Sequence, residues 1–282
     1  MNRHRLILLL AAVVLSCGAA LAQEYTPEEF QARYERLVRT LGYDGVGIET
    51  LLDRWAAAYP DDPAVSQARF SYYLEKGRTT EMVPKPTRRR FMGQPPTLTL
   101  QDPEGGDVPY FEEDFYDEEY FGLAIRVLDQ QIAAHPDELR WYSLKLSALC
   151  AYEKESPDMA AGELKTLIDR QASSRPAWTL DGEPVGEDIF QQFVGESCYD
   201  FFQVASVTSY EYFREISERM NKLFPDNPAF LDNIGSYWQV ARNNDKQAAK
   251  YYKKALKLDP DDYAATRNLQ IIEKKQAQSK KK

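Results

Sequence analysis

Residues 224–262, FPDNPAFLDNIGSYWQVARNNDKQAAKYYKKALKLDPDD, contain near each end a proline followed by an acidic residue. Proline cannot continue an α-helix, because it lacks the backbone N–H and its ring clashes with the preceding turn. The Asp or Asn that follows can accept the free N–H groups at the start of the next helix. The motif therefore predicts a sharp turn between two helices. It occurs at four places, Tyr59–Asp62, His135–Glu138, Phe224–Asn227 and Asp259–Asp262.

The segments between these turns carry apolar residues at helical spacing. We therefore predict an all-α fold. The last predicted helix is polar and charged in its second half, as expected of a helix that caps a stack. The expected helices cover residues 27–41, 45–58, 63–76, 117–134, 138–153, 157–171, 187–206, 209–223, 228–242, 245–258 and 262–276.

The segment 228–260 has the most specific pattern. Its first half carries large apolar or aromatic residues and one glycine, at Leu231, Ile234, Gly235 and Trp238. Its second half carries Ala248, Tyr252, Ala255 and Pro260. This pattern, and the 35 residues from Pro225 to Pro260, resemble the 34-residue unit of the tetratricopeptide repeat (TPR) family. One extra residue is expected in the turn at 243–245.

The resemblance implies a TPR-like α–α superhelix, a solenoid of antiparallel helix pairs, over residues 23–276. Segments 27–76 and 117–223 match the pattern less closely. Trp55 and Gln131 stand where the family has a small residue.

Two segments interrupt the predicted helices. Residues 77–116 are rich in proline and include the alternating stretch Thr97–Gln101, which predicts an inserted β-hairpin near 97–110. Residues 175–186 contain Asp181-Gly182, which indicates a loop or a second hairpin. Residues 262–276 are expected to form the capping helix, and 277–282 a disordered tail.

The first 22 residues have the features of an export signal. Arg3 and Arg5 precede the apolar run 6–16, and Ala20-Leu21-Ala22 forms a cleavage site for a signal peptidase. The mature chain is then expected to begin near Gln23 and to be periplasmic. The alternative is a lipoprotein anchored through Cys17, although Leu15 fits a lipoprotein motif poorly.

The charge of the chain argues against a nucleic-acid partner. Without residues 1–22, 33 Lys and Arg remain against 44 Asp and Glu, a net charge of −11. Affinity for nucleic acid comes largely from cations that neutralise phosphates.

No later stretch is long enough to span a membrane. Cys150 and Cys198 could form one disulfide, but their apolar helical surroundings favour packed thiols.

The sequence offers few residues for catalysis or metal binding. His135 is the single histidine after residue 22, and its His-Pro position suggests a partner for a helix C-terminus. Histidine-based nucleophilic or zinc chemistry is therefore not expected, nor is a cofactor.

Acidic residues alternate with aromatic ones over 111–121. We expect them to start a helix and to pair with Arg88–Arg90, whereas a glycan-acting enzyme using carboxylates 112–119 is the alternative.

The resemblance implies a function as well as a fold. In this family a protein or peptide partner docks on the concave face of the superhelix. Carrying the family's groove positions over to this chain gives Tyr142, Asp232, Ser236 and Gln239 as candidate binding residues. The predicted function is a non-enzymatic interaction or scaffold protein of the bacterial cell envelope, with an envelope assembly factor anchored by lipid as an alternative.

Overall fold

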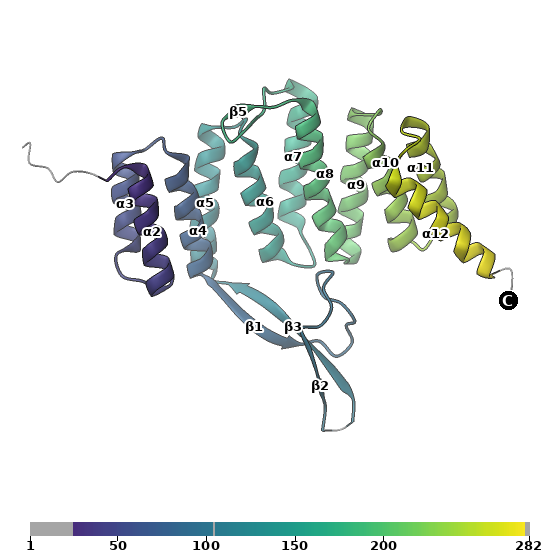
Figure 1. Ribbon diagram of the computed structural model, residues 1–282, viewed down its shortest axis with the longest axis horizontal. Coiled ribbons are helices and arrows are strands. Elements are labelled where there is room, and N and C mark those ends of the chain that lie inside the picture. Colours follow the sequence, from purple (N-terminus) through teal and green to yellow (C-terminus); the bar gives the residue numbers. More distant parts are fainter. Residues whose placement is uncertain (1–24, 104, 280–282) are drawn as a thin grey trace, which may run out of the picture. The chain divides into compact units, whose positions relative to one another are not determined.

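The computed structural model describes residues 25–103 and 105–279. The predicted export signal and Cys17 lie outside these residues. The chain divides into two compact units, unit 1 up to Lys76 and unit 2 from Gly77. The described residues are mainly helical and include a small antiparallel sheet (Figure 1). This confirms the helical class, whereas one continuous TPR superhelix stays a prediction.

Unit 1 consists of helices α2 (Pro27–Leu41), α3 (Ile48–Ala58) and α4 (Pro63–Lys76). Thr26 and Glu29 begin α2 with a reciprocal capping box, and Pro27 occupies its first turn. Phe30 and Trp55 are fully buried, and their rings stack with 6.0 Å between centroids. Trp55, which stands where the family has a small residue, is thus the centre of this core.

The four proline corners have one geometry. The residue before the proline is the last to bond back into the incoming helix, and the second residue after the proline caps the next one. The N–H of this capping residue donates to the carbonyl of the residue before the proline at 3.1–3.2 Å: Asp62 to Tyr59, Glu138 to His135, Asn227 to Phe224 and Asp262 to Asp259. The four capping side chains accept the N–H groups of Ala64, Arg140, Ala229 and Ala265.

Unit 2 contains the remaining elements. Its helices are α5 (Glu118–Ala134), α6 (Leu139–Glu153), α7 (Asp158–Ser174), α8 (Glu187–Val204), α9 (Val207–Leu223), α10 (Pro228–Ser236), α11 (Asp245–Leu258) and α12 (Tyr263–Ser279), with a π-helical turn η1 (Tyr237–Ala241) after α10. Within unit 2 these helices lie side by side in chain order, and the sheet projects beyond their ends (Figure 1). Helix α12 runs to Ser279, so residues 277–279 are helical where a tail was predicted.

The sheet has three strands rather than the predicted two. Strands β2 (Leu98–Gln101) and β3 (Asp107–Tyr116) form the expected hairpin, but β1 (Arg78–Pro84) also pairs antiparallel with β3, which is the central strand. A second, minimal hairpin joins β4 (Thr179–Leu180) to β5 (Glu183–Pro184). Glu138 fixes this hairpin, because its carboxylate accepts the N–H groups of Asp181 and Gly182, both at 2.9 Å.

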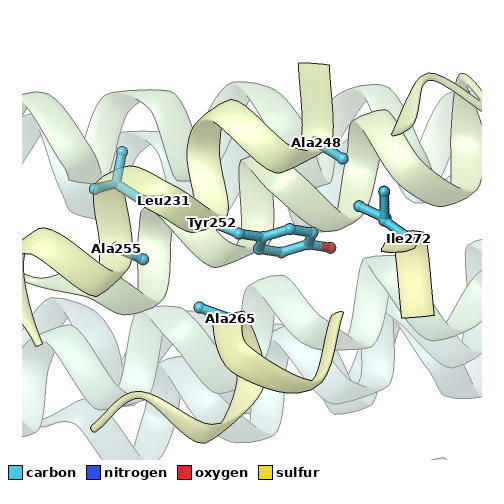
Figure 2. Packing of buried hydrophobic residues seen from close by; sticks show 6 residues of the cluster. All are labelled: Leu231, Ala248, Tyr252, Ala255, Ala265 and Ile272. Carbon is cyan, nitrogen blue, oxygen red and sulfur yellow. The ribbon is translucent and has the colours of Figure 1, made fainter. Parts of the chain in front are cut away.

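The C-terminal helix pair is packed around Tyr252. This residue is fully buried among the apolar side chains shown in Figure 2: Leu231, Ala248, Ala255, Ala265 and Ile272. Gly235 of α10 lies directly against the Tyr252 ring, so that a Cβ atom there would be 2.6 Å from Cε1. The close helix approach expected from the sequence at Gly235 is therefore present.

The extra residue of this pair is not in the turn at 243–245, as the spacing predicted, but inside the first helix. Residues 237–241 form a π-helical turn in which the N–H of Arg242 donates to the carbonyl of Tyr237. Such a turn lets a helix hold one more residue without changing where it begins and ends.

Cys150 and Cys198 are free thiols, as the sequence favoured. Burial raises the pKa of Cys150 and of Cys198 to about 12.

Among the described residues, no helix combines the length and the apolar character that crossing a membrane requires.

We predict that Gly235→Ala lowers the free energy of unfolding by about 1–3 kcal/mol, because the added methyl group overlaps a buried ring. Urea denaturation followed by circular dichroism measures the effect. The matched control is Gly162→Ala in α7, an exposed helical glycine with open space at the Cβ position. It should stabilise the chain by about 0.5–1 kcal/mol. Equal effects of the two substitutions would contradict the packing at Gly235.

We predict that Asp62→Ala destabilises unit 1 by about 1–3 kcal/mol. The substitution removes the cap at the start of α4 and leaves the Trp55 indole N–H, which donates to Asp62 at 2.9 Å, without its acceptor. Asp61→Ala, at the exposed neighbouring residue, should change stability by less than about 0.5 kcal/mol. Thermal unfolding of both variants tests the assignment, which fails if Asp61 proves the more sensitive position.

Candidate functional site

A hollow of 650 Å³ lies between α8 and α10 in unit 2. Helix α8 supplies most of its wall from one face, because residues three and four positions apart share a side of a helix. These residues are Asp188, Gln191, Gln192, Gly195, Glu196, Tyr199 and Asp200. The opposite wall comes from the corner before α10 and from its first turns, at Asn227, Ala229, Phe230 and Asn233. We call this hollow the α8–α10 groove.

The α8–α10 groove is acidic. Asp188, Glu196 and Asp200 line it, and none of the described residues that line it is Lys or Arg. Burial, and then the charge of Glu196, raises the pKa of Asp200 above its ordinary value. The groove thus carries negative charge that the protein itself does not neutralise there.

Amide and aromatic side chains complete the groove. Gln192 donates to Glu196 at 2.8 Å, and Asn227 donates to Gln191 at 2.8 Å across the two walls. Tyr199 is 51% exposed, with its ring against Phe202. An exposed tyrosine beside carboxylates can hold an ammonium or guanidinium group by a cation–π contact and an ion pair together.

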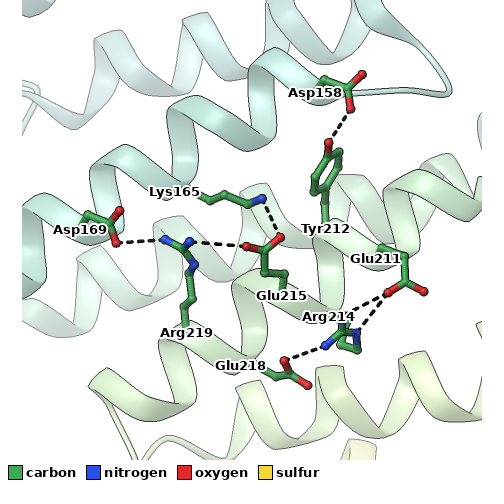
Figure 3. A network of polar contacts seen from close by, with 9 residues as sticks. All are labelled: Asp158, Lys165, Asp169, Glu211, Tyr212, Arg214, Glu215, Glu218 and Arg219. Carbon is green, nitrogen blue, oxygen red and sulfur yellow. Dashed lines mark hydrogen bonds and ion pairs between the residues drawn. The ribbon is translucent and has the colours of Figure 1, made fainter.

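The acids of α7 and α9 have the opposite arrangement, since they are paired within the protein (Figure 3). Glu215 binds Lys165 at 2.6 Å, and Arg214 bridges Glu211 and Glu218 along α9. Arg219 joins Asp169 of α7 to Glu215. This network, like most exposed ion pairs, contributes modest stability, but it leaves these acids little free charge for a partner.

The sequence-predicted site residues lie in two places, away from the lining of the α8–α10 groove. Ser236 and Gln239 both contact Tyr252: its hydroxyl donates to Gln239 at 2.6 Å and lies 3.2 Å from the Ser236 hydroxyl. Asp232, on the same helix, is 8% exposed. The structure thus groups these three around the core of the last pair.

The fourth predicted residue, Tyr142 of α6, is in a core position of its own. Its side chain is 6% exposed, its hydroxyl donates to the Pro136 carbonyl, and its ring edge meets Trp178. No described contact joins Tyr142 to the residues of the last pair.

Sequence reasoning missed the α8–α10 groove, although a signal was present. Residues 188, 192, 196 and 200 follow a four-residue spacing of acids and one amide, and the helix from Glu187 to Val204 contains neither Lys nor Arg. A helix with several acids and no cation cannot pair its charges internally.

The acidic segment 111–121 is largely structural. Glu113 lies between Lys154 at 2.6 Å and Lys85 at 2.9 Å. Burial alone would raise the pKa of Glu113, but these two ammonium groups outweigh it and lower that pKa. Asp117 caps α5, as the sequence indicated.

The expected pairing of these acids with Arg88–Arg90 is wrong. Arg88 binds Glu155, and Arg90 donates to the Gly93 carbonyl. Arg78, which is adjacent in the sheet, binds Asp114 instead. The pairing follows strand register: Arg78 lies opposite Tyr116 of β3 and reaches diagonally to Asp114, two residues away on the same face of the sheet.

The described residues contain no group of three or more His, Cys, Asp and Glu side chains arranged to hold a metal ion. No protein-family model and no curated protein matches this chain.

Proposed function

We propose that this chain is a non-enzymatic interaction protein whose α8–α10 groove binds a protein segment that presents Lys or Arg side chains. The observation that carries the proposal is the contrast between two sides of unit 2. The acids of α9 are paired with arginine and lysine, whereas those of the groove face a hollow without a cation.

The physical argument is electrostatic complementarity. Charges arranged opposite one another speed encounter and exclude partners of the wrong sign. The groove adds amides that can bind backbone groups and a tyrosine that can cover a cation. A segment of a few residues fits a hollow of this volume, since ligand sites commonly measure several hundred Å³.

The wider setting is part of the same proposal. A TPR-like stack, suggested by the pattern at 228–260, would place α8 and α10 as the first helices of consecutive pairs. The export signal predicted over residues 1–22 suggests a scaffold role in the bacterial cell envelope. The binding role of Tyr142, Asp232, Ser236 and Gln239 stays a prediction, although Tyr142 and Asp232 are buried and Tyr142 lies apart from the other three.

The test is site-specific photo-crosslinking in envelope extracts. A photoreactive amino acid at Gln192, which is exposed in the groove, should give a discrete adduct with a partner protein. The same amino acid at Val207, which is 82% exposed but does not line the groove, is the control and should not. An adduct from Val207 alone would exclude the groove.

We predict that neutralising the groove with Asp188→Asn, Glu196→Gln and Asp200→Asn together lowers the adduct yield at least about threefold, because each exposed ion pair contributes roughly 0.2–1 kcal/mol. The matched control neutralises three exposed acids that do not line the groove, Glu81, Asp107 and Asp261. It has the same net charge and should retain the adduct. Equal losses in both triple variants would reduce the effect to overall charge, against the proposal.

A further inference from the structure

A second hollow of unit 2, of 470 Å³, lies along one edge of strand β3. Strand β3 contributes four consecutive residues to its wall, Phe111 to Asp114. The segment that leads into β2 forms another wall, with Pro95 and Pro96, and the end of α6 adds Ala151 and Lys154. We call this hollow the β3-edge hollow.

The backbone groups of β3 bond to its two neighbours in alternation. In an antiparallel ladder, successive residues present their N–H and C=O groups to opposite edges of the strand. The Pro109 carbonyl accepts the N–H of Lys85 at 2.9 Å, so the odd-numbered positions of β3 face β1. The Tyr110 carbonyl accepts the N–H of Thr97 at 2.9 Å, so the even-numbered positions face the edge occupied by β2.

Strand β2 covers only part of this edge (Figure 1). Its pairing begins with Leu98 opposite Tyr110, and the Thr97 hydroxyl then accepts the Glu112 N–H at 3.3 Å. Beyond this point the Glu112 carbonyl and both backbone groups of Asp114 bond to no other described residue. A sheet edge with free N–H and C=O groups is a template on which another strand can pair.

Two prolines keep this edge open. Pro95 and Pro96 directly precede Thr97, at the positions where β2 would have to continue along β3. Proline has no N–H to donate to a ladder, so this segment cannot extend β2. The chain therefore does not cover the backbone groups of Asp114 with its own neighbouring segment.

The two faces of the sheet at this edge differ in chemistry. The charge of Glu113 is balanced by Lys154 at 2.6 Å and Lys85 at 2.9 Å, and the hollow beside it has apolar walls that include Phe111. Glu112 points to the opposite face, because successive side chains of a strand alternate. It is exposed, and no ion pair joins it to another described residue.

We propose that the β3-edge hollow binds an extended segment of a partner protein, which joins the sheet as an antiparallel strand in line with β2. Its backbone bonds to Glu112 and Asp114. An apolar side chain of the segment lies on the Glu113 side of the sheet, and the Lys or Arg next to it lies on the Glu112 side. The site does not involve the α8–α10 groove, and it holds or fails without the proposed function.

The two parts of this recognition have separate physical origins. In strand addition, main-chain hydrogen bonds provide affinity, and the pockets for alternate side chains provide specificity. Opposite charges on neighbouring strands stabilise a sheet, whereas like charges destabilise it. Glu112 therefore favours a segment with Lys or Arg on its face and disfavours one with Asp or Glu there.

The test starts with a displayed library of random linear heptapeptides, selected on the full chain. A peptide counts only if the groove substitutions Asp188→Asn, Glu196→Gln and Asp200→Asn leave its affinity unchanged, which separates this site from the α8–α10 groove. The peptides that remain should carry an apolar residue directly beside Lys or Arg. A selection that yields no such peptide would overturn the proposal.

We predict that Glu112→Gln weakens binding of a selected peptide about two- to fivefold in fluorescence anisotropy, because one cross-strand charge pair is lost. The matched control is Glu81→Gln, which changes an exposed glutamate of the same sheet that does not line the hollow. It should leave the affinity unchanged. Equal losses in the two variants would count against the site.

Amide exchange measured by NMR tests the backbone bonds themselves. At saturating peptide, the Asp114 amide should become at least about tenfold more protected, because its N–H gains an acceptor. The Glu113 amide, which faces β1, should change little. An unchanged Asp114 amide would overturn strand addition. Protection of Asp114 that rises with protein concentration in the absence of peptide would assign the edge to a second copy of the chain, against the proposal.

Discussion

Four of the described helix pairs of this protein, α3–α4, α5–α6, α9–α10 and α11–α12, are joined by a three-residue connection that starts at proline. Proline ends one helix because it has no N–H to give, and the second residue after it starts the next helix by capping. The N–H of that capping residue reaches back to the residue before proline at 3.1–3.2 Å in all four corners. Because the connection is so short, the two helices must pack against each other, and their apolar side chains must therefore be complementary in shape.

The corners fix the backbone, but the size of the core side chains beside them differs from one helix pair to the next. In unit 1 a tryptophan fills the space beside the corner and bonds to the capping Asp62, while in the last pair a glycine admits the ring of Tyr252. The helices next to these corners thus hold a large side chain in one place and none in another, provided that the facing helix compensates. This explains why the sequence pattern varies between segments whose corners are alike.

The helices could be predicted from the sequence because their limits are set by local residues such as Pro60 and Pro225. Strand β1 could not, since its partner β3 lies some thirty residues away in the chain and most of its own side chains are exposed, which leaves no apolar pattern to detect. The candidate site was predicted less well than the fold. Polar residues aligned to a binding face, such as Ser236, bond to a buried tyrosine, whereas the α8–α10 groove depends on which side of α8 its neighbours leave open.

The π-helical turn at 237–241 also affects how this chain should be aligned with others. Because the π-helical turn absorbs one additional residue, each side chain after it occupies the place that the preceding residue would have in a regular helix, where successive side chains are about 100° apart. An alignment that opens its gap in the following loop therefore assigns residues 237–243 to the wrong neighbours, Gln239 among them. Positions after Ser236 can be matched to those of other chains only if the alignment gap is placed inside the helix, within the π-helical turn at 237–241, and not in the loop that follows.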